Sequence, residues 1–182
     1  HIKGLIVNFF HHFWPTLLAI PNFLQVFITP IVKCTKRSQV RVFYTTPEFE
    51  TWSRANTGWR IKYYKGLGTS SAREAKEYFR RLSENRIPFS VLQDGDDTLI
   101  DMCFAKKKVA ARKVWIGQHV AGTHVNFKVS QMKYADFVNK EYIIMAVSSK
   151  LRGIPHVVDG LKPSQRKILF ACLKRKLHTE IK

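Results

Sequence analysis

The sequence predicts an α/β fold, and three observations favour this class. Short segments rich in β-branched and aromatic residues alternate with segments of helical periodicity over the first hundred residues. A glycine-containing break, Lys65 to Gly68, separates one such strand from the helix that follows it. Apolar residues make up 45% of the 182 residues, which is enough to build a core.

The chain is expected to begin with an amphipathic helix that ends near Trp14-Pro15. Its apolar positions recur at helical spacing, at Ile2, Leu5, Ile6, Phe9 and Phe13. The apolar character extends from Gly4 to Val32, but prolines at 15, 21 and 30 leave no uninterrupted span of about 20 residues. We therefore expect no transmembrane helix and no membrane partner.

Two strands are expected next, at Phe27 to Val32 and Val40 to Tyr44, with a basic loop from Lys33 to Arg41 between them. Thr46 is a plausible N-cap for a short helix that contains Pro47 in its first turn. Residues 56–58 are expected to form a loop.

The segment from Arg60 to Tyr64 alternates charged with apolar or aromatic residues, which predicts a short half-buried strand. After the break, Ser71 and Glu74 have the spacing of a capping box at a helix start. Lys65 thus lies between strand and helix, flanked by Gly66 and Gly68, where free N–H groups and the helix dipole favour a phosphate. The alternative is an ordinary tight turn that needs glycine for its backbone angles.

The acidic cluster at residues 94–97 lacks the glutamate that a calcium loop requires, so a solvated turn is expected. One helical segment is then expected from Thr98 to Trp115. It carries five basic and no acidic residues between Ala105 and Lys113. That run is either a solvated face or a set of sequence-independent phosphate contacts.

Residues 117–133 show no sustained period and are interpreted as a linker at a domain boundary. A helix is expected from Tyr134 to Val147, and another with Pro163 in its first turn. Basic residues gather at the start of this second helix, at Lys162, Arg166 and Lys167. Charge and free N–H groups act together there, which is suited to the phosphates of a duplex.

The charge balance supports a polyanionic partner. Thirty-one Lys and Arg stand against thirteen Asp and Glu, for a net charge of +18. The cysteines, Cys34, Cys103 and Cys172, are far apart and show no metal-ligand spacing, so reduced thiols are expected, with neither disulfide nor metal.

Four segments, in this order, carry a resemblance to a known family. His1 to Leu5 is similar to the end of the DxDxDGSHIKG metal motif, and Phe27 to Lys33 also fits. Tyr63 to Ser70 resembles the YKGLG motif of the TOPRIM domain, and Ile154 to Lys167 resembles the start of the winged-helix breakage-reunion region. The chain thus resembles the eukaryotic type IIA DNA topoisomerases, and its Gly122-Thr123-His124 segment looks most similar to the plant enzymes.

The resemblance implies three regions: 1–116 as the C-terminal part of TOPRIM, 117–133 as a linker, and 134–182 as the start of the winged-helix domain. It implies a nuclear, homodimeric, ATP-dependent enzyme that cleaves one duplex and passes another through the gap. A tyrosine attacks the DNA phosphate in that family, and Mg²⁺ stabilises the developing charge.

The catalytic parts of the family are not expected in this chain. The metal-binding carboxylates would precede His1, and no tyrosine here follows an arginine, as the family's nucleophile does. We therefore expect an internal fragment, inactive alone, that binds neither Mg²⁺ nor ATP. What carries over is contact with double-stranded DNA, assigned to Lys65, Gly66, Gly68, Lys162, Arg166 and Lys167. The alternative is a truncated, divergent paralogue that acts only as a basic nucleic-acid-binding or interaction protein, because Lys150 to Gly153 is more basic than the family pattern.

Overall fold

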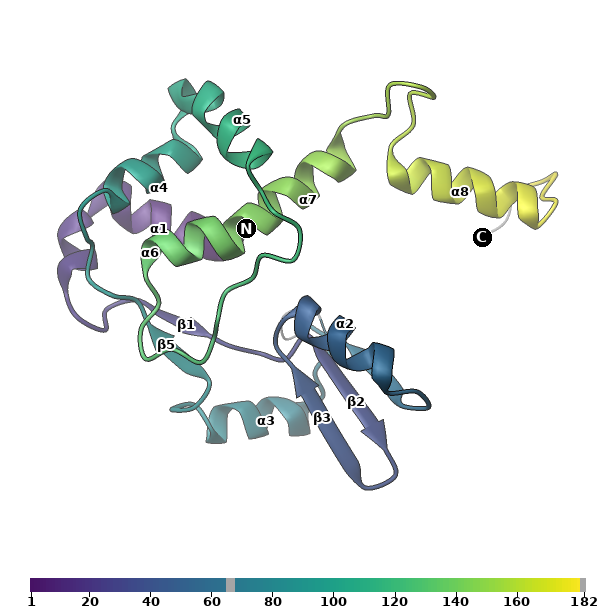
Figure 1. The fold of residues 1–182 in the computed structure, drawn as a ribbon, viewed down its shortest axis with the longest axis horizontal. Helices are drawn as coiled ribbons and strands as arrows, with labels where there is room; N and C mark the ends of the chain where they lie inside the picture. The colour runs from purple at the N-terminus through teal and green to yellow at the C-terminus, as the bar shows by residue number, and fades with distance from the viewer. Residues whose placement is uncertain (65–67, 181–182) are drawn as a thin grey trace.

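The computed structural model describes residues 1–64 and 68–180 and confirms a mixed helix and strand fold (Figure 1). Besides α-helices and strands it contains two 3-10 helices, η1 and η2, and a π-helical segment, η3. In chain order the elements are α1 (Ile2–Phe13), η1 (Pro15–Ala19), β1 (Gln25–Phe27), β2 (Val32–Lys36), β3 (Gln39–Phe43), α2 (Thr46–Ala55), β4 (Arg60–Tyr63), α3 (Ala72–Arg80), β5 (Arg86–Pro88), α4 (Asp96–Phe104), η2 (Lys106–Lys108), α5 (Val109–Gly117), α6 (Tyr134–Asp136), η3 (Phe137–Tyr142), α7 (Ile143–Gly153) and α8 (Pro163–Lys174).

The main core lies among helices α1, α4, α6 and α7 and extends to the β1–β5 pair. Helix α1 has the bounds that its apolar spacing predicts, and it places Val7 against this core. At Gly4 the helix passes so close to the ring of Tyr142 that a Cβ would lie 2.4 Å from Cε2. A glycine is therefore required for this close approach. The free thiols of Cys34 and Cys103 are both buried.

The strands differ from their predicted positions. Residues 28–31, expected in a strand, lie between β1 and β2, and most of the expected basic loop is a hairpin formed by β2 and β3. Lys36 pairs with Gln39, so the connection is the two residues Arg37 and Ser38, and Arg37 adopts a positive φ of 54°. Two-residue hairpin turns need such backbone angles, but usually from Gly or Asn, so no turn signal marks this one in the sequence.

Strand β2 is the centre of an antiparallel sheet with the order β3-β2-β4. Strand β4 has the predicted place but not the predicted burial, because all four of its residues are exposed. Helix α2 covers the sheet with Phe49, which packs with Val32 and Cys34 in a second, smaller core. Its N-cap is Thr45 rather than Thr46, which falls inside the first turn.

The expected helix from Thr98 to Trp115 is instead two helices, α4 and α5, joined through η2. The chain becomes extended at Ala105, with φ −65° and ψ 131°. Arg112 stabilises this corner by donating from Nη1 to the carbonyl oxygens of Met102 and Ala105. The acidic cluster is likewise not a solvated turn throughout, because Asp96 is buried and accepts a hydrogen bond from the Gln93 amide at 2.9 Å.

Residues 118–133 lack regular helices, as expected of a linker, but they are packed. Val125 and Met132 are buried in the main core, and Met132 forms an isolated parallel bridge with Phe89. The helix expected from Tyr134 to Val147 runs without interruption through α6, η3 and α7 to Gly153. The core is therefore continuous across residues 117–133, while the division into domains there stays a prediction.

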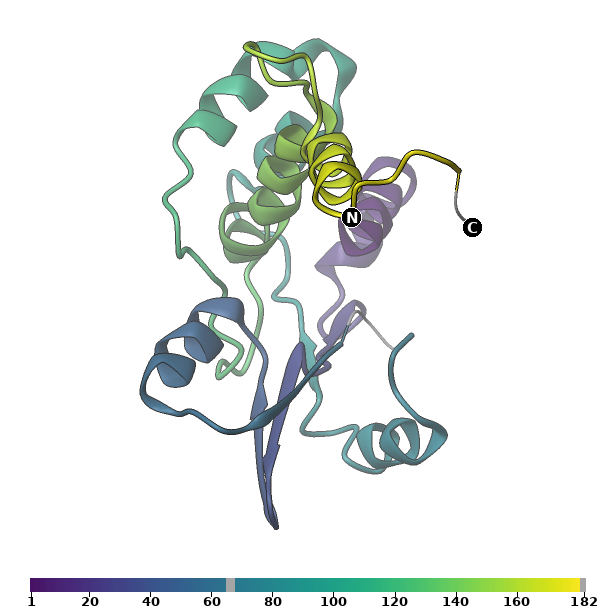
Figure 2. The same ribbon diagram turned by 90° about the vertical axis from the view of Figure 1, so that its right-hand side faces the viewer.

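The C-terminal arm, residues 151–180, extends away from the rest of the chain, and both views show α8 apart from the sheet (Figures 1 and 2). Helix α8 begins at Pro163, as predicted. Among the described residues, no helix has both the length and the apolar character that a membrane crossing needs.

Candidate nucleic-acid interface

The first predicted DNA site is the turn between β4 and α3. Lys65 and Gly66 lie outside the described residues, and Gly68 is exposed. Both flanks of this turn converge on Glu74. Ser71 donates its backbone N–H to Glu74 Oε2 at 2.9 Å, and Glu74 donates its own N–H to Ser71 Oγ, so the predicted capping box is present.

Glu74 also accepts hydrogen bonds from the strand side of the turn. The Tyr64 hydroxyl donates to Oε1, and Lys62 Nζ donates to Oε2 at 3.0 Å. Lys33 Nζ, on β2, lies 3.5 Å from Oε1. The hydrogen bond from Tyr64, followed by that from the Ser71 backbone, holds the pKa of Glu74 far below its ordinary value of 4.5. One carboxylate thus fixes the start of α3 to the ends of two strands.

The outer face of α3 adds a basic surface that the sequence analysis did not single out. A shallow depression of about 560 Å³ is lined by Arg73, Lys76, Arg80 and Arg81, together with Ala72 and Glu77. The signal was available, because Arg73, Lys76 and Arg80 are spaced three and four residues apart and so share one helix face. This face follows directly after the predicted phosphate-binding turn.

The second predicted site is the start of α8. Lys162 is the N-cap, and its backbone N–H donates to Gln165 Oε1 at 2.8 Å. Lys162 and Lys167 are exposed, and no ion pair within the described residues involves either ammonium group. Both are therefore available to an external anion.

Arg166 differs from the two lysines. It donates from Nε to Asp159 Oδ2 at 2.8 Å and from Nη2 to Asp159 Oδ1 at 2.7 Å, a bidentate ion pair. These hydrogen bonds lower the pKa of Asp159 to about 2. The structure thus brings Lys162, Arg166 and Lys167 onto one helix start, with one of the three charges already paired.

The basic run between Ala105 and Lys113 divides in a similar way. Lys106, Lys107 and Lys108 are exposed on η2, whereas Arg112 is half-buried and bonded to backbone carbonyl groups. Of the two interpretations, a solvated face fits the lysines, and a structural role fits Arg112.

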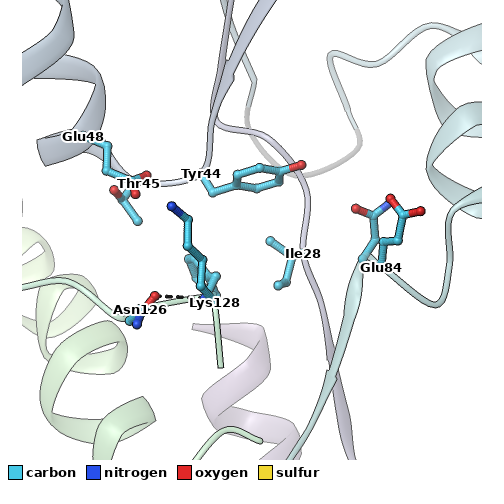
Figure 3. A pocket seen from close by; sticks show the side chains of 9 residues that line it. Ile28, Tyr44, Thr45, Glu48, Glu84, Asn126 and Lys128 are labelled. Atoms are coloured by element: carbon cyan, nitrogen blue, oxygen red, sulfur yellow. Dashed lines mark hydrogen bonds between the residues drawn. The ribbon is translucent and has the colours of Figure 1, made fainter. Parts of the chain in front are cut away.

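The cavities near α2 do not suit a phosphate. The one in Figure 3, about 230 Å³, is walled by Glu48 from α2 and by Glu84, and Lys128 extends between them toward Thr45. The Lys128 backbone N–H is fixed by Asn126 Oδ1 at 2.9 Å. Neither this cavity nor the adjoining one of about 600 Å³ is lined by any described residue of the predicted DNA sites.

The groups needed for catalysis are not gathered in the described part of the chain. No cluster of three or more His, Cys, Asp or Glu side chains that could hold a metal ion occurs there. Burial raises the pKa of the Tyr134 hydroxyl to about 12, and the pKa of Tyr44, Tyr64 and Tyr142 is also raised, mainly by burial. An activated nucleophile would need the opposite shift.

Comparison with known proteins shows what the whole chain is similar to. A family model described as the C-terminal associated domain of TOPRIM matches residues 27–150, and one described as DNA gyrase/topoisomerase IV matches residues 152–182. DNA topoisomerase 2 of Arabidopsis thaliana is 48% identical over all of this chain, which covers 13% of that protein. The probable DNA topoisomerase 2 of Dictyostelium discoideum is 49% identical over all of the chain, which covers 12% of it. Identity therefore does not single out the plant enzyme.

A solved structure agrees with this similarity. The crystal structure of the DNA-binding, cleavage and re-ligation domain of Plasmodium falciparum topoisomerase II has a TM-score of 0.87 and 47% identity, and it covers 100% of this chain and 25% of its own. The chain thus spans about an eighth of the curated relatives' length. With a family model that matches most of its residues, this chain belongs to the family of the C-terminal associated domain of TOPRIM, in the form that eukaryotic type II DNA topoisomerases contain.

Proposed function

We propose that this chain is the part of an ATP-dependent type II DNA topoisomerase that contributes phosphate contacts to the duplex. The observation that carries the proposal is the exposed basic start of α8, in a chain that matches type II topoisomerases from end to end. The parent enzyme cleaves one duplex, passes another and religates the first. It acts in the nucleus as a homodimer.

The contacts are of a kind that positions DNA without reading its sequence. Lys162 and Lys167 place ammonium groups beside the first turn of α8, where N–H groups have no helical partner. Phosphate oxygens accept from both, and neither contact depends on the base. Lys65, with Gly66 and Gly68 beside it, supplies a second contact from the turn before α3.

Magnesium and ATP belong to other parts of the parent enzyme in this proposal. The described residues do not bring together the carboxylates that a magnesium ion needs, so the residues present do not fit the metal. We assign no step of the reaction to a metal, nucleophile or nucleotide held by this chain, and we expect the isolated chain to be inactive in DNA relaxation.

The proposal is tested by measuring binding of the chain to a short fluorescent duplex over a salt series. Changing Lys162, Arg166 and Lys167 together to Ala is expected to weaken binding and to reduce the slope of log K against log salt by about two units. A matched control changes Lys106, Lys107 and Lys108 to Ala, which removes the same charge elsewhere. Equal losses in both triple variants would mean that the charge of the chain binds diffusely, and the proposal would fail.

A further inference from the structure

The turn that precedes α8 is organised around one acidic side chain. Asp159 Oδ1 accepts the backbone N–H of Leu161 at 3.0 Å, and both carboxylate oxygens accept from Arg166. Arg166 Nη2 also donates to the Leu161 carbonyl oxygen at 3.2 Å. Asp159 therefore links the turn to the first turn of the helix.

Backbone contacts close the same turn from the other side. His156 donates its N–H to the Leu161 carbonyl oxygen at 3.0 Å, and Gly160 donates to the His156 carbonyl oxygen at 2.8 Å. Gly160 has a φ of 67°, which allows this tight reversal. Since little of the arm is packed against the core, these local bonds fix the direction from which Lys162 enters the helix.

The ion pair also changes how the basic cluster presents its charge. Asp159 is one of only two acidic residues between Lys150 and Lys182, where nine are basic. Its carboxylate neutralises the guanidinium of Arg166, and the bidentate geometry uses Nε and Nη2. A phosphate could take these donors only by displacing the carboxylate, whereas Lys162 and Lys167 have no such competitor among the described residues.

We propose that Asp159 is a positioning residue that holds Arg166 in the turn, so that Lys162 and Lys167, rather than Arg166, make the phosphate contacts of this helix start. This inference rests on the proposed function of the same surface. It replaces the assignment of Arg166 as a direct contact by a structural role, and it gives the acidic residue of a basic arm a function in DNA binding.

Single variants in the duplex titration distinguish the two roles of Arg166. Each of K162A and K167A is expected to reduce the salt slope by about 0.9. R166A is expected to weaken binding about tenfold with the slope unchanged, because it loosens the turn without removing a phosphate contact. R166K keeps the charge but not the planar fork, so it should weaken binding as much as R166A does.

Asp159→Asn is the sharpest single test. Asparagine keeps an oxygen that can accept the Leu161 N–H but releases Arg166, which becomes free to meet a phosphate, so the slope should steepen by about one unit. An unchanged slope in D159N, or a slope reduced by about 0.9 in R166A and restored in R166K, would show that Arg166 already contacts phosphate and would overturn the proposal.

A measurement without DNA separates this inference from the proposed function. The Asp159 carboxyl should titrate near pH 2 in the wild-type chain and closer to its ordinary value in R166K, as followed by NMR. If duplex binding does not depend on Lys162 and Lys167, the proposed function fails even with that titration intact. If the titration is the same in both chains, the ion pair is absent and this inference fails, whatever the binding data show.

Discussion

The two parts of this chain are held in place by different forces. In the part up to residue 150, side chains such as Ile100 and Tyr134 are almost fully buried, and one core joins helices to strands from both ends of that part. In the described residues 151–180 no side chain is buried, and Ile168 and Phe170 are about two-thirds exposed. The arm keeps its shape through local hydrogen bonds such as those of Asp159. The surface proposed to bind DNA is thus the least packed part of the molecule.

Removing the same atoms from each part should give the largest contrast. Ile100→Ala deletes a side chain with no exposed area, and a loss of about 2–5 kcal/mol in the free energy of unfolding is expected. Ile168→Ala, on exposed α8, is expected to change it by no more than about 0.5 kcal/mol. Urea unfolding followed by circular dichroism measures both. Similar losses would show that α8 is packed as tightly as the core.

Adding atoms should distinguish the close-packed core from open positions. In Gly4→Ala the new methyl group meets the buried ring of Tyr142, and overpacking of this kind costs about 1–3 kcal/mol. Gly117→Ala, at the last residue of α5, has no atom within 4 Å of its Cβ and should be neutral or stabilising by up to about 1 kcal/mol. Thermal melting of both variants measures the difference, and equal midpoints would contradict the packing at Gly4.

The smallest effect is expected at Glu74, which joins α3 to two strands. Its folded pKa is below the unfolded value of about 4.5, so its contribution to stability is complete above that pH and is lost as the pH falls through the folded pKa. Glu74→Gln should cost about 1 kcal/mol at pH 7, and the difference from wild type should shrink in acid. Glu77→Gln, exposed on the same helix, is the control. A cost for E74Q that stays constant down to about pH 2 would exclude the charged network.

The sequence predicted those elements that carry a local signal. The apolar spacing of α1, the Ser71–Glu74 capping box and Pro163 at the start of α8 all depend on neighbours within one or two turns, and all three are present. The order of motifs also predicted the family correctly.

What the sequence could not predict depends on longer-range contacts or on unusual backbone angles. The β2–β3 hairpin turns at Arg37, where no glycine marks a positive φ. The corner at Ala105 is fixed by Arg112, seven residues away. The pairing of Arg166 with Asp159 likewise needs a folded turn, so a row of basic residues was interpreted as three equivalent contacts.

Hydrogen exchange with and without a short duplex tests the central claim most directly, because it reports on both parts of the chain at once. In the free chain, amides of α8 should exchange much faster than those of α4 and η3, since few buried contacts protect them. Addition of duplex should slow exchange across residues 159–175 and leave residues 96–104 and 134–147 unchanged. Slowed exchange at residues 106–113 with none in α8 would contradict the account and place the DNA surface elsewhere.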